Sequence, residues 1–257
     1  VYGGYSLCSV SINIDSARPD NMSNSYLGEN LIFIISQPRS GSTLLQRILA
    51  GHPDIESSAE TWLMLHPVFG NREHGIETAY GANWALLARN DFLENYTDGM
   101  SVYDEAVRAW AKTFYDAALE HSGGKIFIDK TPRYAMIIPE LLQLFPKARF
   151  VFLLRNPLAV LASTLNSFVK DKLNILDEFR PDLLEAPEQI LAGISQLGDK
   201  AVVVRYEDLV RDPEAQVEEL CRRLNIDFTE SMLDYSNTPE AKGFMTDRIG
   251  IQQRVRP

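Results

Sequence analysis

The sequence predicts an α/β fold in which helices flank a parallel sheet. Two short runs rich in apolar residues, at 31–36 and 148–154, predict strands, and the first is typical of a strand that is buried on both faces. Longer segments whose apolar residues recur with helical spacing alternate with such strands. The chain of 257 residues, with 45% hydrophobic residues, has the size and composition of a globular α/β domain.

Each predicted strand is followed by a helix. Strands are expected at residues 31–36, 125–129, 148–154 and 201–205. Helices are expected at residues 43–51, 132–145, 157–170 and 212–224. Three of these helices have a proline near their start, where proline is tolerated, and Asp212 is a good N-cap for the last one. In parallel sheets ligands bind beyond the carboxyl ends of the strands, so functional residues are expected directly after them.

Two long segments interrupt the alternation of strands and helices. Residues 62–123 are aromatic-rich and mostly helical in pattern, and residues 166–199 are polar. Insertions over the carboxyl edge of a sheet commonly form a lid or an acceptor pocket, and we expect that here. Residues 29–257 are predicted to form one domain. Residues 1–28 precede it as an N-terminal extension or linker, either with an added edge strand or as the remnant of a longer polypeptide.

The charge and cysteine content narrow the function and the compartment. A net charge of −10 argues against a protein that coats nucleic acid or anionic membrane, although a pocket for a phosphate-bearing small molecule needs only local positive charge. The two cysteines, Cys8 and Cys221, cannot form a disulfide framework, which favours a reducing compartment. No apolar run has the length of a membrane span, and the first residues lack the order of a signal peptide. We therefore expect a cytoplasmic protein.

The loop over residues 38–43 lies where a phosphate-binding loop lies in a P-loop-type fold, between a buried strand and a helix. Its backbone amides and the hydroxyls of Ser40, Ser42 and Thr43 would converge on an anion. The loop differs from a Walker A motif, because the first glycine and the lysine before Ser/Thr are missing and its cation, Arg39, comes early. An ordinary tight turn is the alternative for such a loop taken alone.

Three further motifs come after predicted strands. Arg155 follows the strongest strand, and Ser163 comes eight residues later on the next helix. About two helical turns separate the helix start from Ser163, so both side chains can reach one phosphate beside the loop. Tyr206 follows the last strand, where its ring could contact a base, and Lys130 follows the second strand within Asp-Lys-Thr-Pro.

Taken together, these residues resemble the family of sulfotransferases that use 3′-phosphoadenosine-5′-phosphosulfate (PAPS). Residues 38–45 resemble the family's 5′-phosphosulfate loop, and Arg155 with Ser163 resembles its 3′-phosphate motif at the usual spacing. The motifs occur in the family's order between about residue 31 and residue 224. The resemblance implies a P-loop-type parallel sheet. It also implies transfer of a sulfuryl group from PAPS to a hydroxyl-bearing acceptor, which leaves adenosine-3′,5′-bisphosphate (PAP).

The pattern departs from the cytosolic small-molecule branch of that family. That branch has a lysine in place of Arg39, and a catalytic histidine where Pro132 follows Lys130-Thr131 here. The loop together with the later Glu60-Thr61 instead resembles the tyrosylprotein sulfotransferase branch and related bacterial enzymes. In that branch this glutamate is the base, while the loop arginine and a matching lysine stabilise the transferring group. The resemblance thus assigns catalysis to Glu60, Arg39 and Lys130.

The resemblance also implies which residues bind the donor. These are Arg39, Ser40, Gly41, Ser42, Thr43, Leu44, Arg155, Ser163 and Tyr206. The family's final nucleotide-binding stretch is poorly matched, and only residues 246–248 and 253–254 are candidates for it. No metal is needed for this chemistry, and the sequence shows no cluster of metal-ligating residues.

Several alternatives stay open. Glu60 could be an acidic residue in the first turn of a helix, which the helix dipole favours. His66, six residues later, is either a plain helix-face residue or a second base. A P-loop kinase would need the missing Walker lysine, whereas a binding module without transferase activity would keep the nucleotide site as a scaffold.

The acceptor is expected to be a small-molecule or carrier-bound compound with a hydroxyl group. The acidic balance of the chain and the aromatic residues of the 62–123 insertion favour an acceptor that is neutral or cationic and partly apolar.

Overall fold

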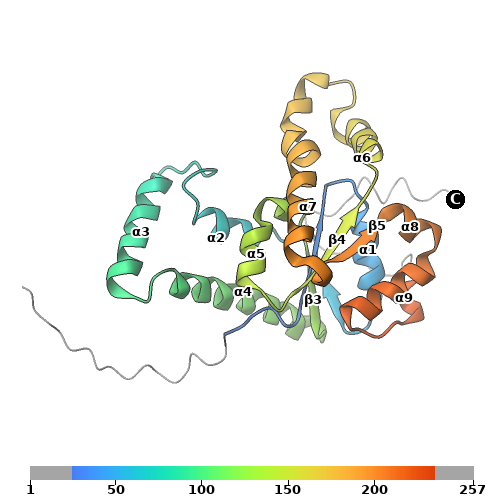
Figure 1. The fold of residues 1–257 in the computed structure, drawn as a ribbon, viewed down its shortest axis with the longest axis horizontal. Coiled ribbons are helices and arrows are strands. Elements are labelled where there is room, and N and C mark those ends of the chain that lie inside the picture. The colour runs from blue at the N-terminus through green and yellow to red at the C-terminus, as the bar shows by residue number, and fades with distance from the viewer. Residues whose placement is uncertain (1–24, 235–257) are drawn as a thin grey trace, which may run out of the picture.

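A parallel sheet forms the centre of the protein, as Figure 1 shows in a computed structural model that describes residues 25–234. Within these residues the strands lie in the order β2-β3-β1-β4-β5, and all neighbours are parallel. The strands are β1 (Leu31–Ser36), β2 (Ile55–Ser57), β3 (Ile126–Lys130), β4 (Arg149–Leu154) and β5 (Val202–Arg205). The predicted α/β architecture is confirmed.

Helices cover both faces of this sheet. The α-helices are α1 (Ser42–Leu49), α2 (Leu65–Phe69), α3 (Ala82–Tyr96), α4 (Met100–Ser122), α5 (Ile138–Leu144), α6 (Pro157–Thr164), α7 (Ala186–Leu197), α8 (Tyr206–Arg211) and α9 (Pro213–Leu224). Shorter 3-10 helices lie at Pro132–Ile137, Leu173–Phe179, Gly198–Lys200 and Glu230–Met232, and π-helical turns at Leu165–Val169 and Pro181–Glu185.

Strand β1 divides the hydrophobic core into two halves. All six of its residues are buried, and its side chains alternate between the two faces of the sheet. Leu31, Phe33 and Ile35 pack in the half that holds α4, α5 and α7. Ile32 and Ile34 pack in the half that holds α1 and α9. This two-sided burial is the reason for the uninterrupted apolar run in the sequence.

The structure corrects several predicted boundaries. Strand β2 was not predicted, because only three residues form it and two of them are polar. The continuous helix predicted over residues 132–145 is wrong: a 3-10 helix ends at Ile137 and α5 begins at Ile138. Pro139 explains the break, since a proline ring clashes with the carbonyl four residues earlier in a continuous α-helix.

The other predicted helices are also interrupted or extended. The helix predicted over residues 157–170 ends as an α-helix at Thr164 and continues as a π-helical turn. Directly after β5 the chain forms a short helix, α8, that was not predicted, and α9 then begins at Pro213. Asp212 caps α9 as predicted, because its side chain accepts a hydrogen bond from the Ala215 amide at 3.4 Å.

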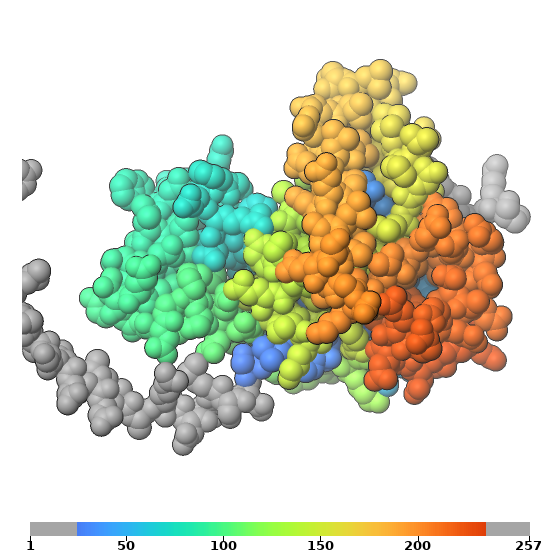
Figure 2. Space-filling view, in the orientation of Figure 1, coloured from blue at the N-terminus to red at the C-terminus, as the bar shows by residue number. Residues whose placement is uncertain are grey.

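The two insertions are largely helical and project from different sides of the sheet. In Figure 1, α4 runs from the sheet, against which it packs, outward to α3, while α6 and α7 rise together beyond the end of β4. Figure 2 shows these parts as two separate projections with an indentation between them. Because α6 follows β4 directly, the second projection stands over the carboxyl edge, where the sequence predicts a ligand.

Some predictions fall outside residues 25–234. These are most of the 1–28 extension and the C-terminal nucleotide-binding candidates at residues 246–248 and 253–254. Within the described part of the chain, no helix combines the length and apolar composition that crossing a bilayer requires. The same part of the chain has no group of three or more histidine, cysteine, aspartate or glutamate side chains that could hold a metal ion.

Candidate active site

The loop between β1 and α1 has an unusual backbone conformation. Arg39 has a φ of 67° and Gly41 a φ of 94°, both in the left-handed region. For Arg39 this conformation costs on the order of 1 kcal/mol or more, so surrounding contacts must hold it. A Cβ at Gly41 would lie 2.4 Å from ring carbons of Tyr206. The loop therefore requires glycine here, both for its turn and for its contact with the start of α8.

The start of α1 presents hydrogen-bond donors at the carboxyl edge of the sheet. The Leu44 amide donates to the Gly41 carbonyl at 3.0 Å, but the amides of Ser42 and Thr43 precede the first intrahelical bond. The hydroxyl of Ser40 is buried without a hydrogen-bond partner among the described residues. Such a set of donors binds anions. The Leu44 side chain packs in the core and its amide is already bonded to Gly41, so Leu44 could contact a ligand only through backbone atoms at the start of α1.

Arg39, Arg155, Ser163 and Tyr206 come together beside this loop. Arg155 Nη1 donates to the Arg39 carbonyl at 2.9 Å, and Arg39 Nε donates to Ser163 Oγ at 3.3 Å. The Arg155 guanidinium lies over the Tyr206 ring, 4.3 Å from its centroid. Arg155 Nε is buried without an acceptor among the described residues. Motifs far apart in the sequence thus form one cluster, and the ligand they bind stays a prediction.

Glu60 and Lys130 form a largely buried ion pair at the same edge of the sheet. Lys130 is the last residue of β3 and is 3% exposed. Its Nζ lies 3.0 Å from Glu60 Oε1, and Glu60 Oε2 accepts a hydrogen bond from Trp62 Nε1 at 3.2 Å. A buried ammonium group needs a charged partner, and Glu60 supplies it. The alternative that Glu60 begins a helix is wrong, because it lies in an irregular segment and α2 begins only at Leu65.

A second ion pair connects the 166–199 insertion to the same edge. Arg133 Nη2 lies 3.1 Å from Asp182 Oδ2, and Gln37 Nε2 donates to the Asp182 carbonyl at 3.0 Å. Burial raises the pKa of Asp182, the charge of Glu60 raises it further, and Arg133 opposes both. Asp182 thus lies within electrostatic reach of Glu60. Sequence reasoning missed Arg133 and Asp182, because neither has a motif that distinguishes it from a surface charge.

An apolar groove of about 550 Å³ lies between α6 and the 166–199 insertion. Gln37 of the loop lines one part of it, next to the residue that accepts its hydrogen bond. The apolar lining consists of Pro157, Leu158, Leu161, Leu176, Leu183 and Leu184, and Asp177 and Arg180 are also in contact with it. The 166–199 insertion therefore borders a leucine-lined groove beside the loop, and the binding of an acceptor there stays a prediction.

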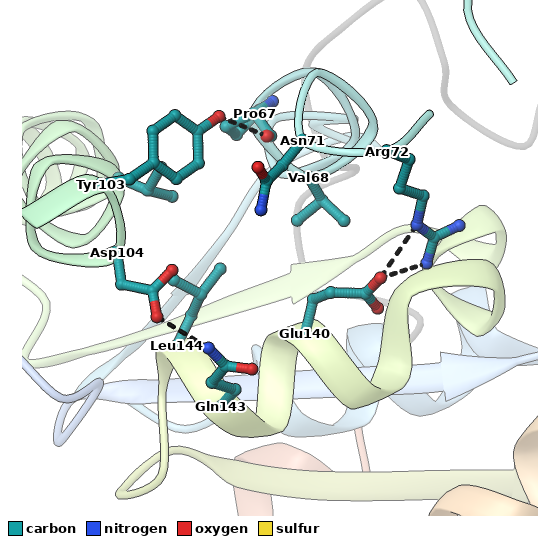
Figure 3. Close-up of a pocket in the computed structure, with 10 residues that line it drawn as sticks. Pro67, Val68, Asn71, Arg72, Tyr103, Asp104, Glu140, Gln143 and Leu144 are labelled. Atoms are coloured by element: carbon teal, nitrogen blue, oxygen red, sulfur yellow. Dashed lines mark hydrogen bonds and ion pairs between the residues drawn. The ribbon is translucent and has the colours of Figure 1, made fainter. Parts of the chain in front are cut away.

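A smaller pocket beside α2 shares no lining residue with the site described so far. His66 is exposed on α2. Figure 3 shows this pocket, of about 80 Å³, between α2, α4 and α5. Arg72 and Glu140 form an ion pair there, and Tyr103 donates to the Pro67 carbonyl at 2.7 Å. The described residues that line this pocket include none of the predicted catalytic or donor-binding residues.

Comparison with known proteins decides the family. A profile of the sulfotransferase family matches residues 31–230, from β1 to beyond α9. The chain belongs to the sulfotransferase family. The matched region contains the loop, the Arg39–Arg155–Ser163–Tyr206 cluster and the Glu60–Lys130 pair. The family resemblance drawn from the sequence is confirmed.

Curated relatives come from bacteria and animals. The nodulation protein NoeE of Sinorhizobium fredii is 33% identical over 217 residues, which are 77% of this chain and 50% of NoeE. A putative protein-tyrosine sulfotransferase of Caenorhabditis briggsae is 25% identical over 235 residues, 89% of this chain and 77% of that protein. The chain therefore spans half the length of NoeE and about three quarters of the nematode protein.

Solved sulfotransferase domains have the same fold. The domain from the Synechococcus PCC 7002 olefin synthase aligns with a TM-score of 0.58 and 26% identity, over 89% of this chain and 85% of that one. The domain from the curacin biosynthetic pathway aligns with a TM-score of 0.54 and 27% identity, over 84% of this chain and 78% of that one. Helices on a parallel sheet are thus the shared architecture of these chains.

Proposed function

We propose that this protein transfers the sulfuryl group of PAPS to a hydroxyl-bearing acceptor. The observation that supports this most strongly is that two sites meet at one edge of the sheet. One is the anion-binding loop with Arg39, Arg155 and Ser163, and the other is the ion pair of Glu60 and Lys130. Membership of the sulfotransferase family supports the class of reaction.

Two buried polar atoms without partners in the described chain suit an anionic donor. The Ser40 hydroxyl and Arg155 Nε are both buried and lack hydrogen bonds, which is costly unless a ligand supplies them. We assign the 5′-phosphosulfate to the loop. The Arg39 side chain and the hydroxyls of Ser40, Ser42 and Thr43 would bind it, together with backbone atoms of the loop that include those of Gly41 and Leu44. We assign the 3′-phosphate to Arg155 and Ser163, and the adenine to the Tyr206 ring.

The proposed reaction is an in-line displacement at sulfur. Glu60 takes the proton of the acceptor hydroxyl while the acceptor oxygen forms a bond to sulfur. The bond between sulfur and the 5′-phosphate oxygen breaks, and its electron pair leaves with PAP. The products are a sulfate ester, PAP and a protonated Glu60. Positioning and charge stabilisation supply most of the catalysis in such transfers.

The Glu60–Lys130 pair links proton uptake to charge stabilisation. In the structure the Lys130 ammonium is neutralised by Glu60 at 3.0 Å. When Glu60 accepts a proton it loses its charge, so the Lys130 charge becomes available to the sulfuryl oxygens and the departing phosphate. Arg39 supplies a second positive charge from the loop. This coupling needs no metal ion.

We further propose that the acceptor is neutral and partly apolar. The leucine-lined groove beside Gln37 would take its apolar part. We call the Glu60–Lys130 and Arg133–Asp182 pairs the acceptor side of the site; because their charges cancel, they add little net charge that would attract an ionic compound. The proteins that this chain resembles include a putative protein-tyrosine sulfotransferase and the sulfotransferase domain of an olefin synthase. The acceptor of this chain, free or attached to a carrier, is therefore best found by experiment.

Nucleotide binding and turnover test the proposal. Melting temperature is measured with PAP, with ATP plus magnesium and with neither, and labelled PAPS is then offered with a panel of hydroxyl compounds. We expect PAP alone to raise the melting temperature and label to appear on an apolar alcohol or phenol. Stabilisation by ATP with magnesium instead of PAP would favour a P-loop kinase. PAP binding without transfer to any acceptor would favour a nucleotide-binding module.

A further inference from the structure

Asp129 is a buried carboxylate whose partners in the described chain are all neutral. It is fully buried at the end of β3, directly before Lys130. Hydroxyl groups surround it: those of Thr61 (2.8 and 2.9 Å to its two oxygens), Tyr115 (2.7 Å) and Tyr134 (2.9 Å) donate to it. A carboxylate in such a place is costly to bury. Burial raises the pKa of Asp129, and the hydroxyl donors only partly oppose this.

The hydroxyl donors tie separate parts of the fold to this one carboxylate. Thr61 belongs to the irregular segment after β2, Tyr115 to α4, and Tyr134 to the 3-10 helix after β3. Tyr134 also accepts a hydrogen bond from the Met64 amide at 3.1 Å. Asp129 therefore connects the 62–123 insertion and the segment that contains Glu60 to the edge of the sheet.

Three consecutive residues of that segment contact three consecutive residues at the end of β3. Glu60 pairs with Lys130, Thr61 donates to Asp129, and the Trp62 amide donates to Thr131 Oγ1 at 3.3 Å. Trp62 has a left-handed φ of 54°, which is unfavourable for a residue with a large side chain. Contacts with the end of β3, and not regular secondary structure, hold the segment in place.

From this geometry we infer that Asp129 is a positioning residue that fixes the Glu60 carboxylate relative to Lys130, acting through the Thr61 hydroxyl. Glu60 lies outside any helix or strand, so its backbone needs an anchor close by. The Thr61–Asp129 hydrogen bonds provide this anchor. Thr61 is the neighbour of Glu60 in the chain, and Asp129 is the neighbour of Lys130. A base must be held within a fraction of an ångström of its working position. The catalytic consequence rests on the proposed sulfotransferase function, whereas the positioning itself does not.

A spectroscopic signal tests the positioning independently of any reaction. The Trp62 indole N–H donates to Glu60, so its NMR resonance reports where the carboxylate lies. The chain has three tryptophans, and Trp62→Phe identifies the resonance by its loss. We expect Asp129→Asn and Thr61→Val to move this resonance. Thr61→Ser, which restores the hydroxyl, is expected to return it to the wild-type position.

Tyr103→Phe is the matched control for these variants. It also removes one hydroxyl that donates a hydrogen bond, but at the separate pocket of Figure 3, where Tyr103 donates to the Pro67 carbonyl. We expect the Trp62 resonance to stay unchanged in this variant. If Asp129→Asn does not fold, the Thr61→Val and Thr61→Ser pair still decides the question.

Kinetics test the catalytic consequence. With an acceptor identified, Asp129→Asn and Thr61→Val should lower kcat by about 10- to 100-fold, since a displacement of about 1 Å can cost a hundredfold. The KM for PAPS should stay near wild type, and Thr61→Ser should recover most of kcat. An unmoved Trp62 resonance in both Asp129→Asn and Thr61→Val would overturn the inference. Absence of turnover in the wild type would count against the proposed function only, because the resonance still tests the positioning.

Discussion

The donor side and the acceptor side of the site are built in different ways. On the donor side, backbone geometry does most of the positioning: a left-handed loop, a helix start and a glycine that the Tyr206 ring contacts. Arg155 donates to the neutral Arg39 carbonyl, and its Nε is buried without an acceptor among the described residues. On the acceptor side, side chains do the positioning, and Lys130 is paired with a carboxylate. The donor side thus suits a ligand that brings negative charge, and the acceptor side suits a neutral one.

The largest expected effect is on the acceptor side, in Glu60→Gln. Glutamine keeps the size and one acceptor oxygen for Lys130 but cannot take a proton from the acceptor hydroxyl. Turnover should fall by about 10²–10⁴-fold, the usual contribution of a general base. PAP affinity should stay near wild type, because the residues assigned to PAP belong to the other side. Steady-state kinetics and PAP titration on the same preparation measure both.

Glu140→Gln is the matched control for Glu60→Gln. It replaces another carboxylate that is paired with a cation, Arg72, but in the separate pocket of Figure 3. Turnover should remain close to wild type in this variant. If Glu60→Gln also retained normal turnover, the base would have to be another group, and the proposed use of the Glu60–Lys130 pair would be wrong.

The next effect is on the donor side, in Arg155→Ala. A charge-assisted hydrogen bond to a phosphate contributes on the order of 1.5–3 kcal/mol, so PAP affinity should fall by roughly tenfold or more. AMP, which lacks the 3′-phosphate, should lose less affinity. Isothermal titration with both nucleotides gives the two ratios. The control is Arg205→Ala, an exposed arginine at the end of β5 whose guanidinium lies 3.8 Å from Asp208.

An equal loss for PAP and AMP in Arg155→Ala would contradict the 3′-phosphate assignment. It would show that Arg155 acts only by supporting the loop, through its bond to the Arg39 carbonyl, or by packing on the Tyr206 ring. Ser163→Ala tests the 3′-phosphate assignment without removing either of these two contacts of Arg155, since the described hydrogen bond of Ser163 is with Arg39 Nε. If the assignment is right, this variant should also weaken PAP more than AMP.

The contrast between the two sides also explains what the sequence could predict. The residues of the donor side follow buried strands, so their place at the carboxyl edge follows from a parallel sheet alone. Arg155 and Ser163 reach the loop because the helix rise places them there. The order of strands and motifs along the chain was therefore enough to predict that these residues lie together.

The acceptor side was less predictable because it depends on contacts between distant segments. Asp182 faces Arg133 only because the 166–199 insertion folds back over the edge of the sheet. The segment around Glu60 follows β2, a strand of three residues that carries no apolar pattern. Glu60 itself could be named only through family resemblance. Its pairing with Lys130, and the Thr61–Asp129 contact beside it, became visible only in the folded chain.

A smaller effect distinguishes backbone strain from ligand contact on the donor side. Gly41→Ala and Gly123→Ala both place a side chain at a left-handed φ, 94° and 78° respectively, which costs about 1–2 kcal/mol of unfolding free energy. A Cβ at Gly123 meets nothing within 4 Å, whereas one at Gly41 meets the Tyr206 ring. Urea unfolding should show destabilisation in both variants. Only Gly41→Ala should also weaken PAP binding. Equal PAP affinities in the two variants would mean that Tyr206 does not contact the nucleotide.

The smallest effect concerns the pH dependence of stability on the acceptor side. Burial raises the pKa of Asp182, so the folded state holds its proton more tightly than the unfolded state does. The stability that this proton contributes is present at low pH and is lost as pH rises through the raised pKa. Asp182→Asn resembles the protonated form at every pH. The unfolding free energy of the wild type should therefore fall relative to this variant between about pH 4 and neutral pH.

Glu29 provides a control of opposite sign for this comparison. Hydrogen bonds from backbone amides and from Lys147 lower the pKa of Glu29, despite some burial. Its contribution to stability is present above the ordinary glutamate pKa and is lost as pH falls through the lowered value. Relative to Glu29→Gln, the wild type should therefore gain stability as pH rises over the acidic range. Urea unfolding of both pairs from pH 3 to pH 7 should give slopes of opposite sign. Slopes of the same sign would mean that Arg133 outweighs burial at Asp182, and that the acceptor side holds this carboxylate ionised more readily than water does.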